Sequence, residues 1–135
     1  MNVHSVSQDL QANHAIGAID AVGGVNGGAI DCKDFDEALI IANFGTTDGS
    51  IVVKLQEDVA SGGSYADIAS AAFTAVTSAN DNASYKARLK LTGSRLRYIR
   101  AVSTQTGGTA GIVAVNILLF KSSQGGPQGS LVFDV

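Results

Sequence analysis

The two histidines, His4 and His14, are the first residues of this chain to consider for proton transfer or metal binding. Both lie in a stretch without clear periodicity, residues 1–14, which we interpret as an extended N-terminal arm. A nucleophile and its base need a hydrogen-bond geometry held by a rigid scaffold, and an arm does not provide one. No third ligand stands at a spacing suited to zinc. The histidines therefore predict neither catalysis nor a metal site.

Acidic residues form two groups near the ends of expected strands, where carboxylates are able to hold calcium. The two groups are Asp31, Asp34, Asp36 and Glu37, and then Glu57, Asp58 and Asp67. Neither group has the regular spacing of a calcium-binding loop. Carboxylate pairs that cleave glycosides work in an aromatic cleft, and a chain with no Trp and three Tyr does not readily line one. We therefore expect solvated loops, with no metal, no cofactor and no enzymatic activity.

The net charge, the single cysteine and the lack of long apolar runs limit the classes of partner and the cellular compartment that we expect. A formal net charge of −3 argues against general nucleic-acid binding. The single cysteine, Cys32, excludes an internal disulfide, and we expect it to be a small buried hydrophobe. No apolar run is long enough to span a bilayer, and the polar N-terminus does not resemble a signal peptide. We expect a protein made in a cytoplasm, without membrane contact, and leave later export inside a larger particle open.

The fold class follows from short strand patterns separated by turn signals at about 8–12-residue intervals. Such spacing predicts an all-β protein, either an antiparallel sandwich or a barrel, and we assign the chain to the antiparallel β-sandwich class. Ala, Val, Ile and Gly dominate the composition, and small or β-branched side chains suit closely packed sheets. At 135 residues the chain is most simply one domain. We assign residues 1–14 to the arm, 15–121 to the sandwich, and 122–135 to a linker and C-terminal tail.

The clearest alternation lies in residues 85–91, where Tyr, Ala, Leu and Leu alternate with Lys, Arg and Lys. This pattern is typical of a half-buried strand, and a turn at 92–94 leads to residues 95–103, its expected hairpin partner. Six basic residues would then share one hairpin, either as a solvated face, as a docking surface for an acidic partner or neighbouring subunit, or, less favoured, as a nucleic-acid surface. The residues that we assign to polar docking are Arg88, Arg95, Arg97 and Arg100.

The strand expected at residues 111–121 is apolar on both faces. One set of alternating side chains is expected to enter the core, namely Val113, Val115, Ile117 and Leu119. The other set needs a cover, either another strand layer or a second subunit. The residues that we assign to a subunit interface are Ile112, Ala114, Leu118 and Phe120.

Three further segments have readable patterns. Residues 37–44 (EALIIANF) are nearly continuous in apolar character and predict a central strand covered on both faces. Residues 65–76 contain helix-forming alanines, but the flanking β-branched residues and close turns favour extended structure. Residues 122–130 have the composition of a flexible linker, followed by a strand-like segment, 131–135. That segment either pairs with a sheet edge of another chain or folds back onto its own domain.

A combination of short motifs resembles a group of small tailed-phage virion proteins. In that group a strand ending in Gln-Glu-Ser/Asp precedes a Gly-Ser turn, an aromatic-x-Asp-Ile/Val-Ala segment and an Arg-Tyr-Ile/Val-Arg-Ala segment. The matching residues here are Gln56-Glu57-Asp58, Gly62-Gly63-Ser64, Tyr65-Ala66-Asp67-Ile68-Ala69 and Arg97-Tyr98-Ile99-Arg100-Ala101. The similarity covers roughly residues 31–120.

This resemblance implies a capsid decoration, or cement, protein with a β-sandwich or jelly-roll-like fold. Such proteins lie as homotrimers on the capsid surface of a bacteriophage virion, bind the major capsid protein, and have a structural role. Two other functions stay open. One is a receptor- or carbohydrate-binding module of a phage tail or fibre, and the other is a head–tail connector or tail-tube subunit that forms hexameric rings.

Overall fold

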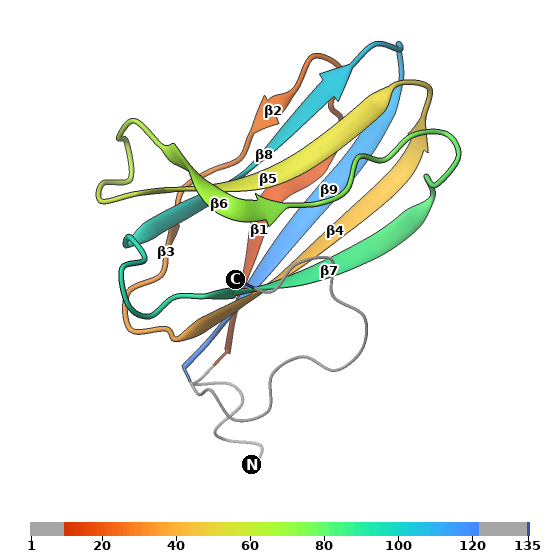
Figure 1. Ribbon diagram of the computed structural model, residues 1–135. Helices are drawn as coiled ribbons and strands as arrows, with labels where there is room; N and C mark the ends of the chain where they lie inside the picture. Colours follow the sequence, from red (N-terminus) through yellow and green to blue (C-terminus); the bar gives the residue numbers. More distant parts are fainter. Residues whose placement is uncertain (1–9, 122–134) are drawn as a thin grey trace.

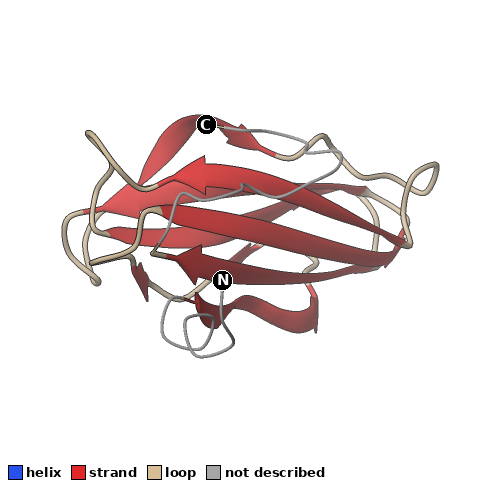
Figure 2. Cartoon of the chain, turned by 90° about the horizontal axis from the view of Figure 1, so that it is seen from below, coloured by secondary structure: helices blue, strands red, loops and turns tan. Residues whose placement is uncertain are grey.

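The computed structural model describes residues 10–121 and 135 of the chain. Figure 2 shows strands and loops throughout these residues, and no helix long and apolar enough to cross a bilayer occurs among them. The strands in order are β1 (Leu10–Asp20), β2 (Val25–Asn26), β3 (Ile30–Asp31), β4 (Glu37–Thr47), β5 (Ser50–Asp58), β6 (Ala66–Ala72), β7 (Ala83–Lys90), β8 (Tyr98–Thr106) and β9 (Gly111–Phe120).

The strands form two antiparallel sheets that face each other (Figure 1). Sheet A has the order β1-β9-β4-β7, and sheet B has the order β2-β8-β5-β6, with β3 also paired to β8. The pairs are nested along the sequence, since β1 pairs with β9, β2 and β3 with β8, β4 with β7, and β5 with β6. This nesting across two sheets is a jelly roll, so the predicted all-β, jelly-roll-like sandwich is confirmed.

The core lies between the sheets and is filled by every second residue of the long strands. In β4 the pattern is regular, because Ala38, Ile40, Ala42 and Phe44 are buried while the residues between them are half-buried. The alternation predicted for residues 85–91 is also present in β7, where Ala87 and Leu89 are fully buried. The sequence period therefore identified the core-facing side chains of these strands.

The predicted hairpin between residues 85–91 and 95–103 is wrong. β7 pairs with β4 in sheet A, with Arg88 opposite Leu39, whereas β8 pairs with β5 in sheet B, with Arg100 opposite Gln56. The connection between β7 and β8 therefore crosses from one sheet to the other. Alternation specifies which face of a strand is buried but not which strand lies beside it, and here the partners distant in sequence complete both sheets.

Two other segments differ in extent from the sequence interpretation. β1 begins at Leu10, within the residues assigned to the arm, because residues 10–14 pair with the end of β9, from Phe120 to Asn116. The segment predicted to be extended at 65–76 forms β6, followed by a bridge between Val76 and Ile51, so its extended character is confirmed. Ser70 has a φ of 62° at the register break of this edge strand.

Asp48 joins the two turns at one end of the sandwich. Its carboxylate accepts the N–H groups of Thr109 and Ala110, each at 2.8 Å, and the Thr109 hydroxyl at 2.9 Å. Gly108 has a φ of +75°, and a side chain there would collide with the same carboxylate. These hydrogen bonds stabilise the charged form and so hold the pKa of Asp48 below its usual value, and the bond from the Ala110 N–H has the largest effect. The β4–β5 and β8–β9 turns are thus held as one unit.

We predict that Asp48→Ala lowers the melting temperature at pH 7, because three donors lose their acceptor. Thermal unfolding followed by circular dichroism measures the change. The matched control is Asp36→Ala, which removes the same charge at the opposite end of β4, where the carboxylate accepts no hydrogen bond from the described residues. Equal loss of stability in the two variants would contradict the role of Asp48.

Candidate functional site

The outward side of sheet A carries a contiguous group of apolar side chains, which we call the outer apolar face. Strand register places them together, since β9 and β4 are neighbours, with Leu118 opposite Leu39 and Asn116 opposite Ile41. The group consists of Leu39, Ile41, Ile112, Ala114, Leu118 and Phe120. Ile112 is 47% exposed and the others are half-buried. The four residues assigned to a subunit interface thus share one surface, and the interface itself stays a prediction.

Leu39 and Ile41 belong to this face although the sequence analysis assigned β4 to a position covered on both sides. The structure buries one side of β4 in the core and leaves Leu39 and Ile41 half-buried on the other. The apolar side chains of Leu39 and Ile41 were visible in the nearly continuous apolar run of residues 37–44. What the run did not specify was that β9 and β4 would lie side by side, so that their uncovered faces merge.

A basic margin borders the outer apolar face on the side of β7. Lys86, Arg88 and Lys90 lie opposite Ile41, Leu39 and Glu37, respectively. Arg88, one of the four arginines assigned to docking, therefore lies beside the apolar residues. An apolar centre with a charged margin is the usual composition of a protein–protein contact surface.

Of the other three arginines assigned to docking, Arg100 lies on β8 of sheet B, and Arg95 and Arg97 lie in the connection that leads into β8. The predicted grouping of basic residues in one hairpin is therefore wrong. Arg95 lies 3.3 Å from a carboxylate oxygen of Glu57. Arg97 donates two hydrogen bonds to Asp31, at 2.9 and 2.8 Å, and Arg100 donates one to Gln56 at 2.8 Å. These arginines hold segments of their own chain together, and a docking role for them stays a prediction.

Residues of three of the four motifs that carry the family resemblance meet in one polar network on the outward side of sheet B. Lys54 and Gln56 of β5 each donate to the carboxylate of Asp67 on β6, at 2.7 Å. The guanidinium of Arg100 lies 4.4 Å from the ring centre of Tyr65, a cation–π contact. This network attaches the edge strand β6 and its preceding loop to β5 and β8. The spaced motifs therefore have a structural role in this sheet.

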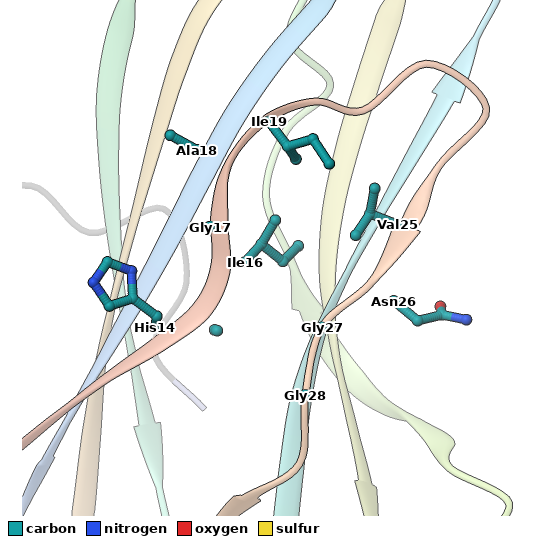
Figure 3. Close-up of a pocket in the computed structure, with 10 residues that line it drawn as sticks. His14, Ile16, Gly17, Ala18, Ile19, Val25, Asn26, Gly27 and Gly28 are labelled. Atoms are coloured by element: carbon teal, nitrogen blue, oxygen red, sulfur yellow. The ribbon is translucent and has the colours of Figure 1, made fainter.

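A groove of about 380 Å³ opens where β1 of sheet A approaches β2 of sheet B (Figure 3). Ile16, Ile19 and Val25 line it, and Figure 3 shows His14 and Asn26 on opposite sides of it. His14 is the one titratable side chain among the described residues of the lining. The groove offers shelter to an apolar group but no converging pair of groups for proton transfer.

Within residues 10–121 and 135, no three His, Cys, Asp or Glu side chains are grouped closely enough to hold a metal ion. Cys32 is 6% exposed, and burial raises the pKa of its thiol to about 12. A thiol with this pKa is protonated at neutral pH, and the thiolate is the reactive form. The expectation that Cys32 is a small buried residue is confirmed.

Comparison with known proteins yields a likeness of fold. No family model and no curated protein matches the chain. Among solved structures, the crystal structure of the SPBc2 prophage-derived protein YomS is similar with a TM-score of 0.50. The match covers 82% of this chain and 93% of that one, at 13% sequence identity. At this identity the comparison establishes a shared sandwich architecture.

We predict that the Asp31–Arg97 pair stabilises the fold at neutral pH but not in acid. Hydrogen bonds lower the pKa of Asp31 from 3.8 to about 2, and those from the Arg97 side chain have the largest effect. Because the pKa is lower in the folded state, the contribution is fully present above about pH 4 and is lost as the pH falls towards 2. The urea midpoints of the wild type and Arg97→Gln should differ at pH 7 and converge near pH 2.

The difference at pH 7 should be small, because both side chains are nearly half exposed and solvent screens the pair. Arg97→Lys is the control, since it keeps the charge but loses the paired hydrogen bonds. A difference between wild type and Arg97→Gln that does not change with pH would contradict the assignment.

We predict that Cys32 does not react with a thiol reagent in the folded protein at pH 8. Its burial and its raised pKa keep the thiolate population very low. Colorimetric titration with a disulfide reagent should report no thiol in buffer and one thiol per chain in guanidinium chloride. Rapid labelling without denaturant, at unchanged secondary structure, would show that the site is open.

Proposed function

We propose that this protein is a bacteriophage capsid decoration protein, which binds the outer surface of the assembled capsid and stabilises it. The observation that carries this proposal is the outer apolar face, an apolar surface that the chain presents next to a basic margin. The motif resemblance supports the same assignment. The likeness of fold to a prophage-derived protein is consistent with a phage origin.

In this proposal the outer apolar face joins three copies of the chain into a homotrimer. Leu39, Leu118 and Phe120 would be removed from water. Two asparagines farther along the same face, Asn116 opposite Ile41 and Asn43 opposite Ala114, would fix the register of the contact. Apolar contacts do not depend on Coulomb attraction, so the trimer would persist in high salt. No nucleic acid or membrane takes part.

The proposed partner of the trimer is the major capsid protein on the capsid surface of the virion, after synthesis in the host cytoplasm. Stabilisation would arise by mass action, because the trimer binds the assembled shell and not its separated parts. At a free concentration about 100 times Kd, each bound site gains about 2.7 kcal/mol. The role is structural and involves no turnover.

We predict that the wild type is a trimer in low and in high salt, and that Leu118→Asp is a monomer. A carboxylate at the centre of the outer apolar face would have to be buried without a partner. Light scattering after size exclusion measures the mass. The matched control is Val59→Asp, which adds the same charge at a position that is 69% exposed and outside the face.

A wild type that stays monomeric in both salts would contradict the trimer, and a hexameric ring would favour the connector alternative. Co-sedimentation then tests the capsid itself. The protein should sediment with assembled shells of its phage and should not bind the disassembled capsid protein. Equal binding to assembled shells and to the disassembled capsid protein would contradict stabilisation by mass action.

A further inference from the structure

The outer edge of β7, one of the two edge strands of sheet A, is contacted at one point by Val135 of the same chain. β7 is the last strand of this sheet, so the outer edge of its backbone has no partner strand among those described. Lys90 N–H donates to the carbonyl of Val135 at 2.6 Å, and Val135 N–H donates to the carbonyl of Arg88 at 3.2 Å. Val135 is half-buried and packs against the core.

These two hydrogen bonds define the direction of the contact. In a parallel pair, the N–H of one residue donates to the carbonyl that precedes its partner, and its carbonyl accepts the N–H that follows its partner. Val135 is therefore paired with Leu89 and runs parallel to β7. Since paired residues share a face of the sheet, the Val135 side chain lies on the core side, as the fully buried Leu89 does.

We propose that the outer edge of β7 is a strand-docking site and that residues 131–135 of the same chain fill it as a parallel edge strand. In that register Phe133 would lie beside Ala87 and Leu131 beside Tyr85. The two residues that would share a face with Val135, Leu131 and Phe133, are both apolar. Asp134 falls beside Arg88 on the outward face, where opposite charges are favourable.

The chain outside the described structure is long enough for docking in the same molecule. Lys121 follows β9, and the docked edge lies three strand spacings away, across β4 and β7, or roughly 15 Å. Phe120 lies level with Lys90, whereas the start of the docked segment would lie beside Tyr85, so the diagonal distance is about 23 Å. The linker of residues 122–130 spans up to roughly 30 Å when extended. The glycine-rich linker therefore reaches β7 without strain.

The inference goes beyond the proposed function and does not rest on it. An unpaired sheet edge is a template for pairing with another chain. A docked segment satisfies the backbone groups of β7 and prevents copies of the protein from joining edge to edge. The occupant is thus the chain itself, held by main-chain hydrogen bonds and by two or three apolar side chains.

Amide hydrogen exchange of the full-length protein, followed by NMR, tests the docking. Val135→Asp and Phe133→Asp should increase the exchange rate of the Lys90 amide by about tenfold or more, the scale of a lost hydrogen bond. Val132→Asp is the matched control, because it places the same charge in the same segment on the outward face. Amides of β9 report any loss of global stability.

Faster exchange at Lys90 in the first two variants, with β9 and the control unchanged, is the expected result. An equal effect of all three variants, or no effect of Phe133→Asp, would overturn the register. Protection of Lys90 that rises with protein concentration would overturn docking in the same chain, because the occupant would then be a second copy.

Discussion

Burial of one face of β9 is the interaction on which the rest of this structure depends. Val113, Val115, Ile117 and Leu119 are fully buried, and each such side chain contributes roughly 1.5–3 kcal/mol relative to exposure. β9 also pairs with β1 on one side and β4 on the other, so it joins the two halves of sheet A. Because side chains alternate along a strand, fixing this face inward fixes the other face outward. The core and the outer apolar face are therefore two sides of one element.

The sequence predicted the faces of the strands better than their neighbours. The alternation in β7 and the two apolar sets of β9 are local patterns, and the structure has them as expected. The strand beside which each strand pairs is not determined by local sequence, because it depends on which strands elsewhere in the chain still have an unpaired edge. For that reason the hairpin between β7 and β8 was wrong, and Leu39 and Ile41 were not recognised as part of the same face as Leu118. Strand order is the information that a single alternation pattern lacks.

The candidate site shows the same limit for charged residues. Arginines grouped in the sequence suggested one docking surface, yet Arg95, Arg97 and Arg100 contact residues that lie far earlier in the chain. A carboxylate such as Asp31 is not recognisable from sequence as the partner of Arg97, because only the pairing of β3 with β8 brings them together. The sequence motifs indicated residues that form specific polar contacts. Only the strand pairing showed that these contacts are made within the same chain.

The nested pairing of the jelly roll also sets the order of events in synthesis. β1 finds its partner only in β9, so sheet A stays incomplete until almost the whole described chain has left the ribosome. Pairings between strands distant in sequence form slowly and leave apolar surface exposed in the meantime. The outer apolar face forms in the same closing step, since four of its six residues come from β9. The proposed self-association through that face would therefore have to follow folding, so assembly would be separated in time from the stage at which nascent chains aggregate.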